Sequence, residues 1–487
     1  MTSPAMDSLF DMIVIGGGTA GMTAARQVAR AGKRVMLVEA DRTGGECLYT
    51  GCVPSKSLLA SAKRLHHIRQ ARAFGIEVGE VSLDWTAVQT RRRRAIATIE
   101  VHDTPEALER AGIKVLTGSA RLSGERTVVV GDRQFRAGAI LIATGSVSTV
   151  PDIAGLDETD PCVHTSERLM ETTTLPKQLA VIGGGPVGVE LGQAFSRFGS
   201  EVTILGRNQR LLPGDDPEIS ALLTDVLRDE GIMVRTGAEV TRVEHGPVGR
   251  IVTFRDLSGE EKSISVDAIL VATGRTPRTA GLDLDIAGVE QNGQGVIVDK
   301  RLRTRAPGIW ACGDVIGPPF YTHVADDQAR TVARNMLGGR ATWSGDTIAW
   351  ATFCDPECAG VGLSEDVARA RYGDRLEVLR FPYSALDRAV TDGVDTGMIK
   401  VLLAPGWTCG RLGGLIVGAH VCGERASEVV QQFAFLMSWK LPAGLLARTV
   451  QAYPSYGLGA RQAIGMHWLT KAPRSPSLFS RIRQLLL

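Results

Sequence analysis

The chain has 487 residues, of which 44% are hydrophobic and 22% charged, with a formal net charge of +2. This length suits about three domains, and the composition is that of a globular protein. The small net charge gives no electrostatic basis for a nucleic-acid partner. We find no run of about 18 apolar residues that could span a membrane, and we expect no secretory signal. The eight cysteines are scattered rather than arranged as a disulfide framework, so we expect a cytoplasmic protein.

The first predicted element is the apolar strand 12–15, which leads into a glycine-rich turn and a helix. The turn fits G-x-G-x-x-G: Gly16 permits a tight turn, Gly18 lets the backbone approach a pyrophosphate, and Gly21 lets the helix pack on its strand. The helix N-terminus offers free N–H groups and partial positive charge to phosphates. Glu39 ends the next strand and can accept hydrogen bonds from ribose hydroxyls. This pattern predicts a site for FAD or NAD.

Two cysteines follow in the segment 44–56, which reads GGECLYTGCVPSK. The spacing of Cys47 and Cys52 predicts two thiols about one helical turn apart, where a helix begins. A thiol at a helix N-terminus has a lowered pKa and can act as a thiolate. One alternative is an inert disulfide, which is unusual in a reducing compartment. The other is a zinc site, which would need a second Cys/His pair that is not evident.

A second strand-turn-helix motif begins with the strand 179–182. Its three glycines are Gly183, Gly185 and Gly188. At the position that matches Glu39, this copy has Gly206, followed by Arg207 and Arg210. A carboxylate there would repel a 2′-phosphate, whereas a guanidinium can bind it bidentately. We therefore assign the first motif to FAD and the second to NADPH, with NADH as a further possibility; plain surface charge is the alternative for the arginines.

The cysteine segment carries a resemblance to a known family. The pattern Gly-Gly-x-Cys-x₄-Cys-Val-Pro-Ser-Lys is similar to the active-site signature of the FAD-dependent (class I) pyridine nucleotide–disulfide oxidoreductases. This family includes glutathione reductase, dihydrolipoamide dehydrogenase and mercuric reductase. Family-like segments follow in order, at 143–145, 272–275, 311–314 and 353–357. The resemblance extends over roughly residues 10 to 468.

The resemblance implies an α/β fold with two Rossmann-like dinucleotide-binding domains and a C-terminal α+β dimerisation domain. The FAD-binding domain would comprise residues 1–150 and 280–345, and the NAD(P)H-binding domain residues 151–279. The dimerisation domain, 346–468, would form a homodimer with a shared active site. Residues 469–487 match nothing in the family and are predicted to be a tail, mobile or packed in the dimer; a membrane-surface helix is the alternative.

By position, the resemblance makes Cys52 the thiolate next to the flavin and Cys47 the interchange thiol. Lys56 and Glu190 resemble the ion pair beside flavin N5, although a helix-surface lysine and a helix-start glutamate are the alternatives. Asp314 resembles the aspartate that binds the ribityl chain of FAD. Further cofactor contacts are expected at Ala120, Thr144, Gly145 and Gly274.

The C-terminal end departs from the disulfide-reducing members of the family. Those members carry His-Pro-x₃-Glu, whose histidine is lent by the partner subunit as a general acid–base. Here Tyr453 stands at the histidine position and Leu458 at the glutamate position. A phenol with a pKa near 10 is a poor proton shuttle at neutral pH, and a positioned shuttle typically contributes about 10²–10⁴-fold in rate. We therefore expect slow or absent turnover of glutathione or lipoamide, and Tyr453 is a candidate catalytic residue.

Mercuric reductases also lack this histidine, and the segment 205–208 resembles their NADPH site. Unlike them, the chain has no cysteine after Cys422. Cys354 and Cys358 are interpreted as two buried, unrelated thiols rather than as a replacement metal-delivery pair. We predict no resident metal site.

These features together predict hydride transfer from NADPH to FAD. Electrons would then pass through the Cys47–Cys52 disulfide to a thiol-bound metal ion or an unusual disulfide. The alternatives are an NAD(P)H:quinone or diaphorase-type flavoprotein that bypasses the cysteines, a dihydrolipoamide dehydrogenase-like enzyme, and a lipoyl-complex subunit that has lost catalysis.

Overall fold

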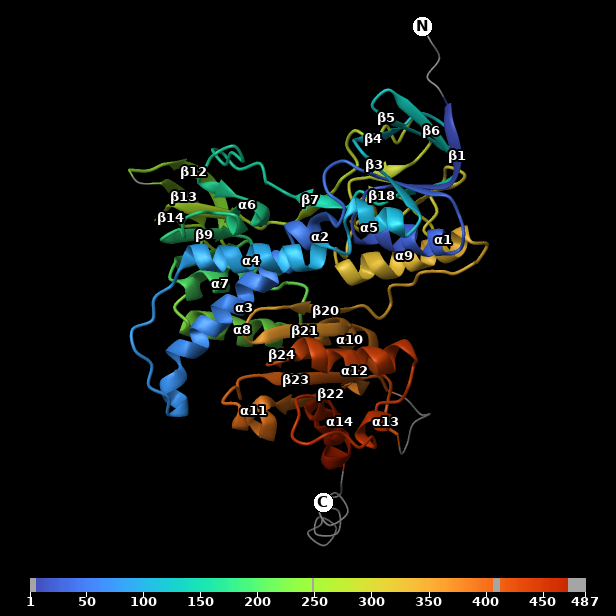
Figure 1. Cartoon of the computed structure of the whole chain (residues 1–487). Coiled ribbons are helices and arrows are strands. Elements are labelled where there is room, and N and C mark those ends of the chain that lie inside the picture. The colour runs from blue at the N-terminus through green and yellow to red at the C-terminus, as the bar shows by residue number, and fades with distance from the viewer. Residues whose placement is uncertain (1–5, 248, 406–411, 472–487) are drawn as a thin grey trace. The chain divides into compact units, whose positions relative to one another are not determined.

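The computed structural model describes residues 6–247, 249–405 and 412–471. The chain divides into two compact units (Figure 1). The larger unit comprises Met1–Gln209 and Ile232–Gly345, and the smaller comprises Arg210–Gly231 and Asp346–Leu487. No helix of the described ranges is both long and apolar enough to cross a membrane. Most of the predicted tail lies outside the described residues.

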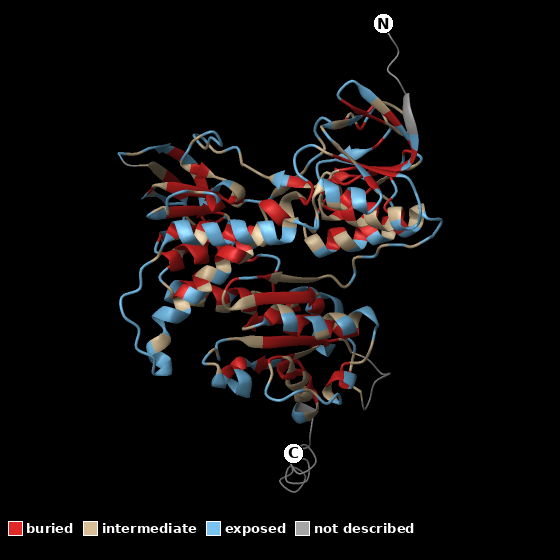
Figure 2. Ribbon diagram, viewed as in Figure 1, coloured by how far each residue is buried: buried red, intermediate tan, exposed pale blue. Residues whose placement is uncertain are grey.

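A seven-stranded sheet organises the first nucleotide-binding fold of the larger unit. Its strands lie in the order β3-β2-β1-β6-β5-β4, and β19 also pairs with β6. Their bounds are β1 Met6–Ile15, β2 Val35–Glu39, β3 Ile113–Thr117, β4 Ala120–Leu122, β5 Thr127–Val130, β6 Arg133–Ile142 and β19 Ile309–Ala311. Along β1, Ile13 and Ile15 join one hydrophobic core, whereas Met12 and Val14 join another. Both faces of this largely parallel sheet are therefore covered, and its strands are mostly buried (Figure 2).

A second parallel sheet repeats this arrangement in the same unit. Its order is β11-β10-β9-β15-β8, with β8 Val163–His164, β9 Gln178–Ile182, β10 Glu201–Gly206, β11 Met233–Thr236 and β15 Ala268–Val271. An antiparallel sheet of β12 (Glu239–His245), β13 (Arg250–Arg255) and β14 (Glu261–Val266) accompanies it. The predicted pair of Rossmann-like folds is confirmed.

The helices that connect these strands carry several of the candidate site residues. Helix α1 (Thr19–Arg30) packs on α9 (Thr322–Met336), and α3 (Cys52–Arg69) packs on α4 (Trp85–Glu100) and α7 (Pro186–Phe198). The shorter helices are α2 Gly45–Tyr49, α5 Pro105–Arg110, α6 Ser166–Met170, η1 Ala71–Phe74 and η2 Asp314–Ile316. The shorter strands are β7 Ser146–Ser148, β16 Arg275–Pro277, β17 Gln291–Asn292 and β18 Gly295–Val296.

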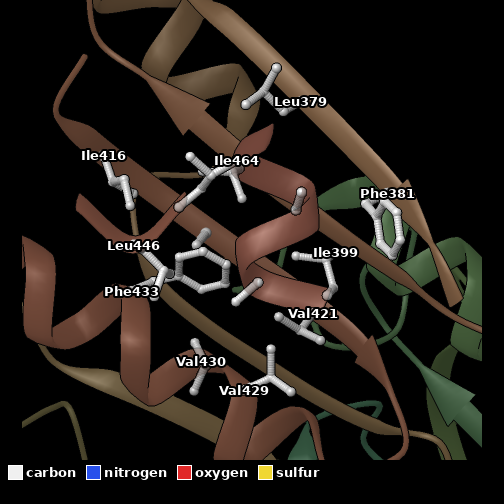
Figure 3. Packing of buried hydrophobic residues seen from close by; sticks show 14 of the residues in the cluster. Leu379, Phe381, Ile399, Ile416, Val421, Val429, Val430, Phe433, Leu446 and Ile464 are labelled. Carbon is white, nitrogen blue, oxygen red and sulfur yellow. The ribbon is translucent and has the colours of Figure 1, made fainter. Parts of the chain in front are cut away.

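The smaller unit is built on an antiparallel sheet in the order β20-β21-β24-β23-β22. Its strands are β20 Ala349–Thr352, β21 Glu357–Gly362, β22 Glu377–Pro382, β23 Met398–Leu403 and β24 Ile416–Gly423. Its helices are α8 Pro217–Asp229, α10 Glu365–Tyr372, α11 Asp387–Thr391, α12 Ala426–Ser438, α13 Gly444–Ala447, α14 Gly457–Lys471, η3 Gly373–Arg375 and η4 Tyr383–Ala385. The side chains of Ile399, Val421, Phe433 and Ile464 meet in its core (Figure 3).

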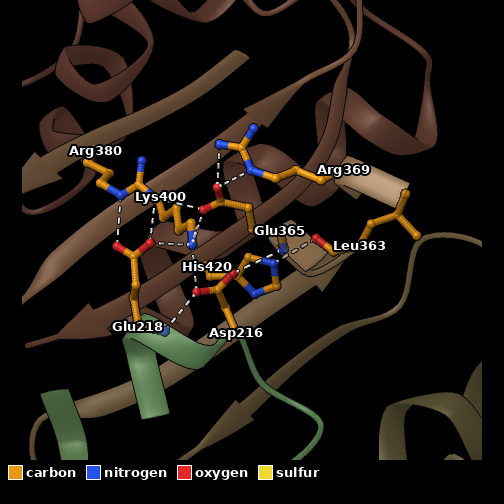
Figure 4. A network of polar contacts seen from close by, with 8 residues as sticks. All are labelled: Asp216, Glu218, Leu363, Glu365, Arg369, Arg380, Lys400 and His420. Carbon is orange, nitrogen blue, oxygen red and sulfur yellow. Dashed lines mark hydrogen bonds and ion pairs between the residues drawn. The ribbon is translucent and has the colours of Figure 1, made fainter. Parts of the chain in front are cut away.

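Helix α8 follows β10 in the chain, inside the range predicted to bind NAD(P)H, but it belongs to the smaller unit. A buried ion cluster joins it to the sheet (Figure 4). Lys400 of β23 is 1% exposed, and its Nζ lies 2.8 Å from Asp216, 2.8 Å from Glu218 and 2.6 Å from Glu365. Asp216 also caps α8, accepting a hydrogen bond from the Glu218 amide. Charge and capping therefore act together at the start of α8.

Candidate active site

The two candidate redox cysteines lie in separate helices. Cys47 lies within α2, and Cys52 is the first residue of α3. The helical conformation is interrupted between them. At Gly51, in this interruption, a Cβ would approach the Glu46 carbonyl oxygen to 3.0 Å. As expected, the segment opens a helix, and Cys52 is its first residue, whereas Cys47 lies in the short helix before it. Both thiols are free in this structure.

The electrostatics distinguish the two thiols. A hydrogen bond with Cys47 lowers the pKa of Cys52 to about 6, and the Thr322 hydroxyl and the positive charge of Lys56 act in the same direction. The hydrogen bond to Cys52, together with burial, raises the pKa of Cys47 well above its usual range. At neutral pH the site therefore holds a Cys52 thiolate next to a protonated Cys47.

Two groups stabilise the charge at Cys52. Lys56 Nζ of α3 donates to Glu190 Oε2 of α7 at 2.7 Å, so the structure forms the ion pair that the sequence predicted. Thr322 Oγ1, at the start of α9, lies 3.6 Å from Cys52 Sγ. Sequence reasoning missed Thr322, because a single threonine 270 residues away carries no local signal.

The first glycine loop has the form that FAD requires. Gly16 has φ +108°, and a Cβ there would lie 2.3 Å from the Ala143 carbonyl oxygen, so only glycine fits. A Cβ at Gly18 would meet no described atom within 4 Å, which leaves the backbone open to a pyrophosphate. Glu39 Oε2 accepts a hydrogen bond from the Gly17 amide at 2.5 Å, which places this carboxylate at the loop. These residues fit the adenosine and pyrophosphate parts of FAD.

The other predicted cofactor contacts lie at or near strand ends of the larger unit. Asp314 begins η2, and its Oδ2 accepts a hydrogen bond from Ser146 at 2.6 Å. Thr144 donates to the Arg278 carbonyl oxygen at 2.6 Å. Ala120 lies in β4, paired with Val130. Gly145 and Gly274 both have positive φ, at +73° and +145°.

The second glycine loop repeats the first. Gly183 has φ +126°, and a Cβ there would lie 2.2 Å from the Ala272 carbonyl oxygen, while Gly185 has open space among the described atoms. A Cβ at Gly188 would lie 2.1 Å from the Gly183 carbonyl oxygen, so the helix packs tightly against the turn. Arg207 directly follows β10 and is exposed. The loop fits a dinucleotide, and Arg207 is available to a 2′-phosphate.

Tyr453 lies in the smaller unit and is 69% exposed. Its hydroxyl donates to Asp387 Oδ2 at 2.7 Å, and this hydrogen bond and the carboxylate charge raise the pKa of the phenol. Tyr456 makes a similar bond to Asp392 at 2.8 Å but is buried. Tyr453 is therefore a neutral hydrogen-bonding group over the physiological pH range.

The remaining described cysteines do not form a second exposed site. Cys354 and Cys358 are buried, as expected, but Cys358 is not isolated: its Sγ lies 3.7 Å from that of Cys422 on the opposite strand. Burial and that contact hold the pKa of Cys358 above its usual range, although the Cys354 thiol opposes the shift. Such thiols are unreactive. Cys409 lies outside the described residues. Within the described ranges, no group of three or more His, Cys, Asp and Glu side chains is arranged to hold a metal ion.

Comparison with known proteins decides the family. A family model described as pyridine nucleotide-disulphide oxidoreductase matches residues 10–329, and the model of its dimerisation domain matches residues 348–463. The chain belongs to the pyridine nucleotide–disulphide oxidoreductase family. Like other members of this family, it is an FAD-dependent oxidoreductase that uses NAD(P)H.

Relatives within the family carry different names. The chain is 36% identical to a dihydrolipoyl dehydrogenase of Thermus scotoductus, over 93% of this chain and 96% of the relative. It is 33% identical to a mercuric reductase of Bacillus cereus, over 93% of this chain and 71% of the relative. The structure of the HOCl-induced flavoprotein disulfide reductase RclA from Escherichia coli matches with a TM-score of 0.82 and 29% identity, covering 94% of this chain and all of that one. Similarity to these oxidoreductases therefore leaves the terminal electron acceptor open.

Proposed function

We propose that this enzyme passes electrons from NADPH through FAD and the Cys47–Cys52 pair to a metal ion carried by thiol compounds, or to an unusual disulfide. The main support is Tyr453, which occupies the position where relatives that reduce disulfides would have a proton shuttle. An efficient general acid–base has a pKa near the working pH, and Asp387 moves the pKa of Tyr453 further from neutrality. Reduction of a metal ion needs electrons but no proton donor. A related structure, 28% identical with a TM-score of 0.84, is a Cu(II) complex.

In this proposal Gly16, Gly18, Gly21, Glu39 and Asp314 hold FAD, and Gly183, Gly185, Gly188 and Arg207 hold NADPH. Bound FAD supplies the hydride acceptor and the donor of an electron pair to the disulfide. Lys56, held by Glu190, places positive charge beside Cys52, so the thiolate forms without an added proton acceptor. NADPH and the disulfide give NADP⁺, the Cys52 thiolate and the Cys47 thiol, and this pair then returns two electrons to the acceptor and releases one proton.

The proposal includes a homodimer in the cytoplasm. A dimerisation domain is present, and NADPH is supplied in the cytoplasm. Tyr453 of the partner subunit would complete the site next to Cys47. A dihydrolipoamide dehydrogenase-like activity is the second candidate, supported by the 36% identity to the Thermus enzyme.

The test is NADPH oxidation by the purified enzyme with mercuric ion in excess thiol, compared with lipoamide, other oxidised disulfides and a quinone. We expect metal-dependent turnover that falls by about 100-fold or more in Cys47→Ser and Cys52→Ser. Cys162→Ser, at a partly exposed cysteine outside the site, is the control and should retain full activity. If mercuric ion only inhibits, the metal proposal is wrong. Rapid lipoamide turnover would support the second candidate, and quinone reduction that survives both serine variants would show that the cysteines are bypassed.

A further inference from the structure

Arg275, the first residue of β16, connects the redox segment to the predicted FAD site. Its guanidinium donates to Glu46 Oε2, to the Ser146 carbonyl oxygen at 3.2 Å and to Ser146 Oγ at 2.8 Å. Ser146 Oγ in turn donates to Asp314 Oδ2 at 2.6 Å, and Arg275 Nε lies 3.9 Å from the same oxygen. A continuous polar chain therefore joins α2, which carries Cys47, to the aspartate predicted to bind the ribityl chain.

Glu46 is the acidic end of this chain, and it follows the segment that contacts the first glycine loop. The Gly44 amide donates to the Gly17 carbonyl oxygen at 2.9 Å. A Cβ at Gly45 would lie 2.6 Å from Gly18 Cα, so the two backbones are in direct contact. Gly18 is the position where the backbone would approach the pyrophosphate of FAD. The α2 segment thus places a carboxylate one residue beyond its contact with the loop predicted to bind the pyrophosphate.

The groups around Glu46 set its charge. Burial raises the pKa of Glu46 to about 7, the positive charge of Arg275 opposes this, and the negative charges of Glu167 and Asp314 add to it. These three groups come from β16, α6 and η2. Raising the pH from 6 to 8 therefore ionises Glu46 and strengthens its electrostatic attraction for the Arg275 guanidinium. Two carboxylates, Glu46 and Asp314, compete for one guanidinium.

We propose that Glu46 is a positioning residue that weakens the hold of the protein on FAD, because it draws the charge of Arg275 toward the cysteine helix and away from the predicted FAD site at Asp314. Neutral glutamine at this position would keep the shape of the side chain but release the charge of Arg275. This role depends on FAD but not on the terminal acceptor. It therefore stands or falls independently of the proposed metal reductase activity.

The experiment measures release of FAD from the purified holoenzyme after rapid dilution, followed by the fluorescence of free flavin. At pH 8, Glu46→Gln should release FAD roughly tenfold more slowly than the wild type, which corresponds to about 1.4 kcal/mol. At pH 6, where wild-type Glu46 is largely protonated, the difference should shrink. Glu167→Gln is the control: it removes a nearby negative charge, but Glu167 is not part of the hydrogen-bonded series from Glu46 to Asp314. This variant should change the rate of FAD release by less than about twofold.

Arg275→Met provides the opposite change and should accelerate release. The proposal is overturned if Glu46→Gln releases FAD as fast as the wild type at pH 8. It is also overturned if Glu167→Gln has the same effect as Glu46→Gln, because the hydrogen-bonded chain would then be irrelevant. If Arg275→Met yields no folded holoenzyme, the comparison of the two glutamine variants still decides.

Discussion

Cys47 and Cys52 are close in the sequence, but the pKa values of their thiols are shifted in opposite directions. Cys52 is favoured as a thiolate because it accepts from Cys47 and Thr322 and lies near the Lys56 ammonium. Cys47 donates in the same contact, so its deprotonation would break a hydrogen bond and place two negative sulfurs together. The negative charge of the pair is thus placed on Cys52 before any substrate arrives.

Thr322→Val is predicted to destabilise the thiolate form of Cys52 relative to the thiol. Loss of one hydrogen bond to an ionised sulfur should raise the pKa of Cys52 from about 6 by about one pH unit. Alkylation of the NADPH-reduced enzyme by iodoacetamide, measured against pH, gives this value. Thr322→Ser retains the hydroxyl and should match the wild type. Identical alkylation profiles for the valine variant and the wild type would show that the 3.6 Å contact has no electrostatic effect.

At the residue scale, the sequence predicts groups that belong to local motifs. The glycines at 16 and 183 can be recognised because strand, turn and helix are contiguous, and Lys56 can be recognised because it lies in the cysteine signature. Thr322, Arg275 and Asp387 could not be found in this way. Each acts on a partner 66 to 270 residues away, and only tertiary folding brings those partners together.

At the scale of elements, the start of α8 is held by charge in the interior of the smaller unit. Lys400 faces three carboxylates, and Arg380 donates to Glu218 and Glu365. The hydrogen bond to Arg380 lowers the pKa of Glu218 to about 2, and Lys400 adds to that effect. Stability from this carboxylate is therefore fully present above its unfolded pKa and is lost progressively as the pH falls from that value through about 2.

Lys400→Met is predicted to destabilise the protein by about 3–5 kcal/mol, because it leaves buried carboxylates without their shared cation. Urea unfolding at pH 7, followed by circular dichroism, measures the loss. Lys262 also contacts two carboxylates but is 43% exposed, so Lys262→Met is a matched control and should change stability by less than about 1 kcal/mol. Equal midpoints for the two variants would contradict a stabilising role of the buried cluster.

The sequence predicted the strand, turn and helix of each nucleotide-binding fold, because a dinucleotide motif contains all three in contiguous residues. The sequence did not predict that α8 belongs to the smaller unit. It lies between β10 and β11 in the chain, and the partner of Asp216 is 184 residues further on. The break between α2 and α3 was also missed, since C-x₄-C spacing fits one helix until the close approach of Gly51 and the Glu46 carbonyl is seen.

At the scale of the whole molecule, large apolar side chains remain exposed on the smaller unit. Phe435 and Trp439 lie on or just after α12, and Val450 and Tyr453 follow further along the chain. Apolar side chains of this size are left in water unless another protein surface covers them. The family model of this region is that of a dimerisation domain, so a second copy of the chain is the expected partner.

Trp439→Glu is predicted to weaken the dimer by about 100-fold, because a charge would replace a large apolar side chain at the expected subunit interface. Sedimentation velocity over a concentration series measures this. Leu257→Glu is the control: Leu257 has the same exposed fraction, 70%, but lies in the larger unit near the β13–β14 turn. A Trp439→Glu protein that sediments as the wild type does would place the subunit interface elsewhere.

The attachment of α8 also limits how this protein can be taken apart. A conventional boundary at residue 346 looks clean in the sequence, but it would separate Asp216 and Glu218 from Lys400. A C-terminal fragment would then carry a buried cation without counterions, and an N-terminal fragment would expose the face of a helix that normally packs on a sheet. Chimeras between relatives should therefore exchange residues 210–231 together with the C-terminal domain, as one packing unit made from two stretches of chain.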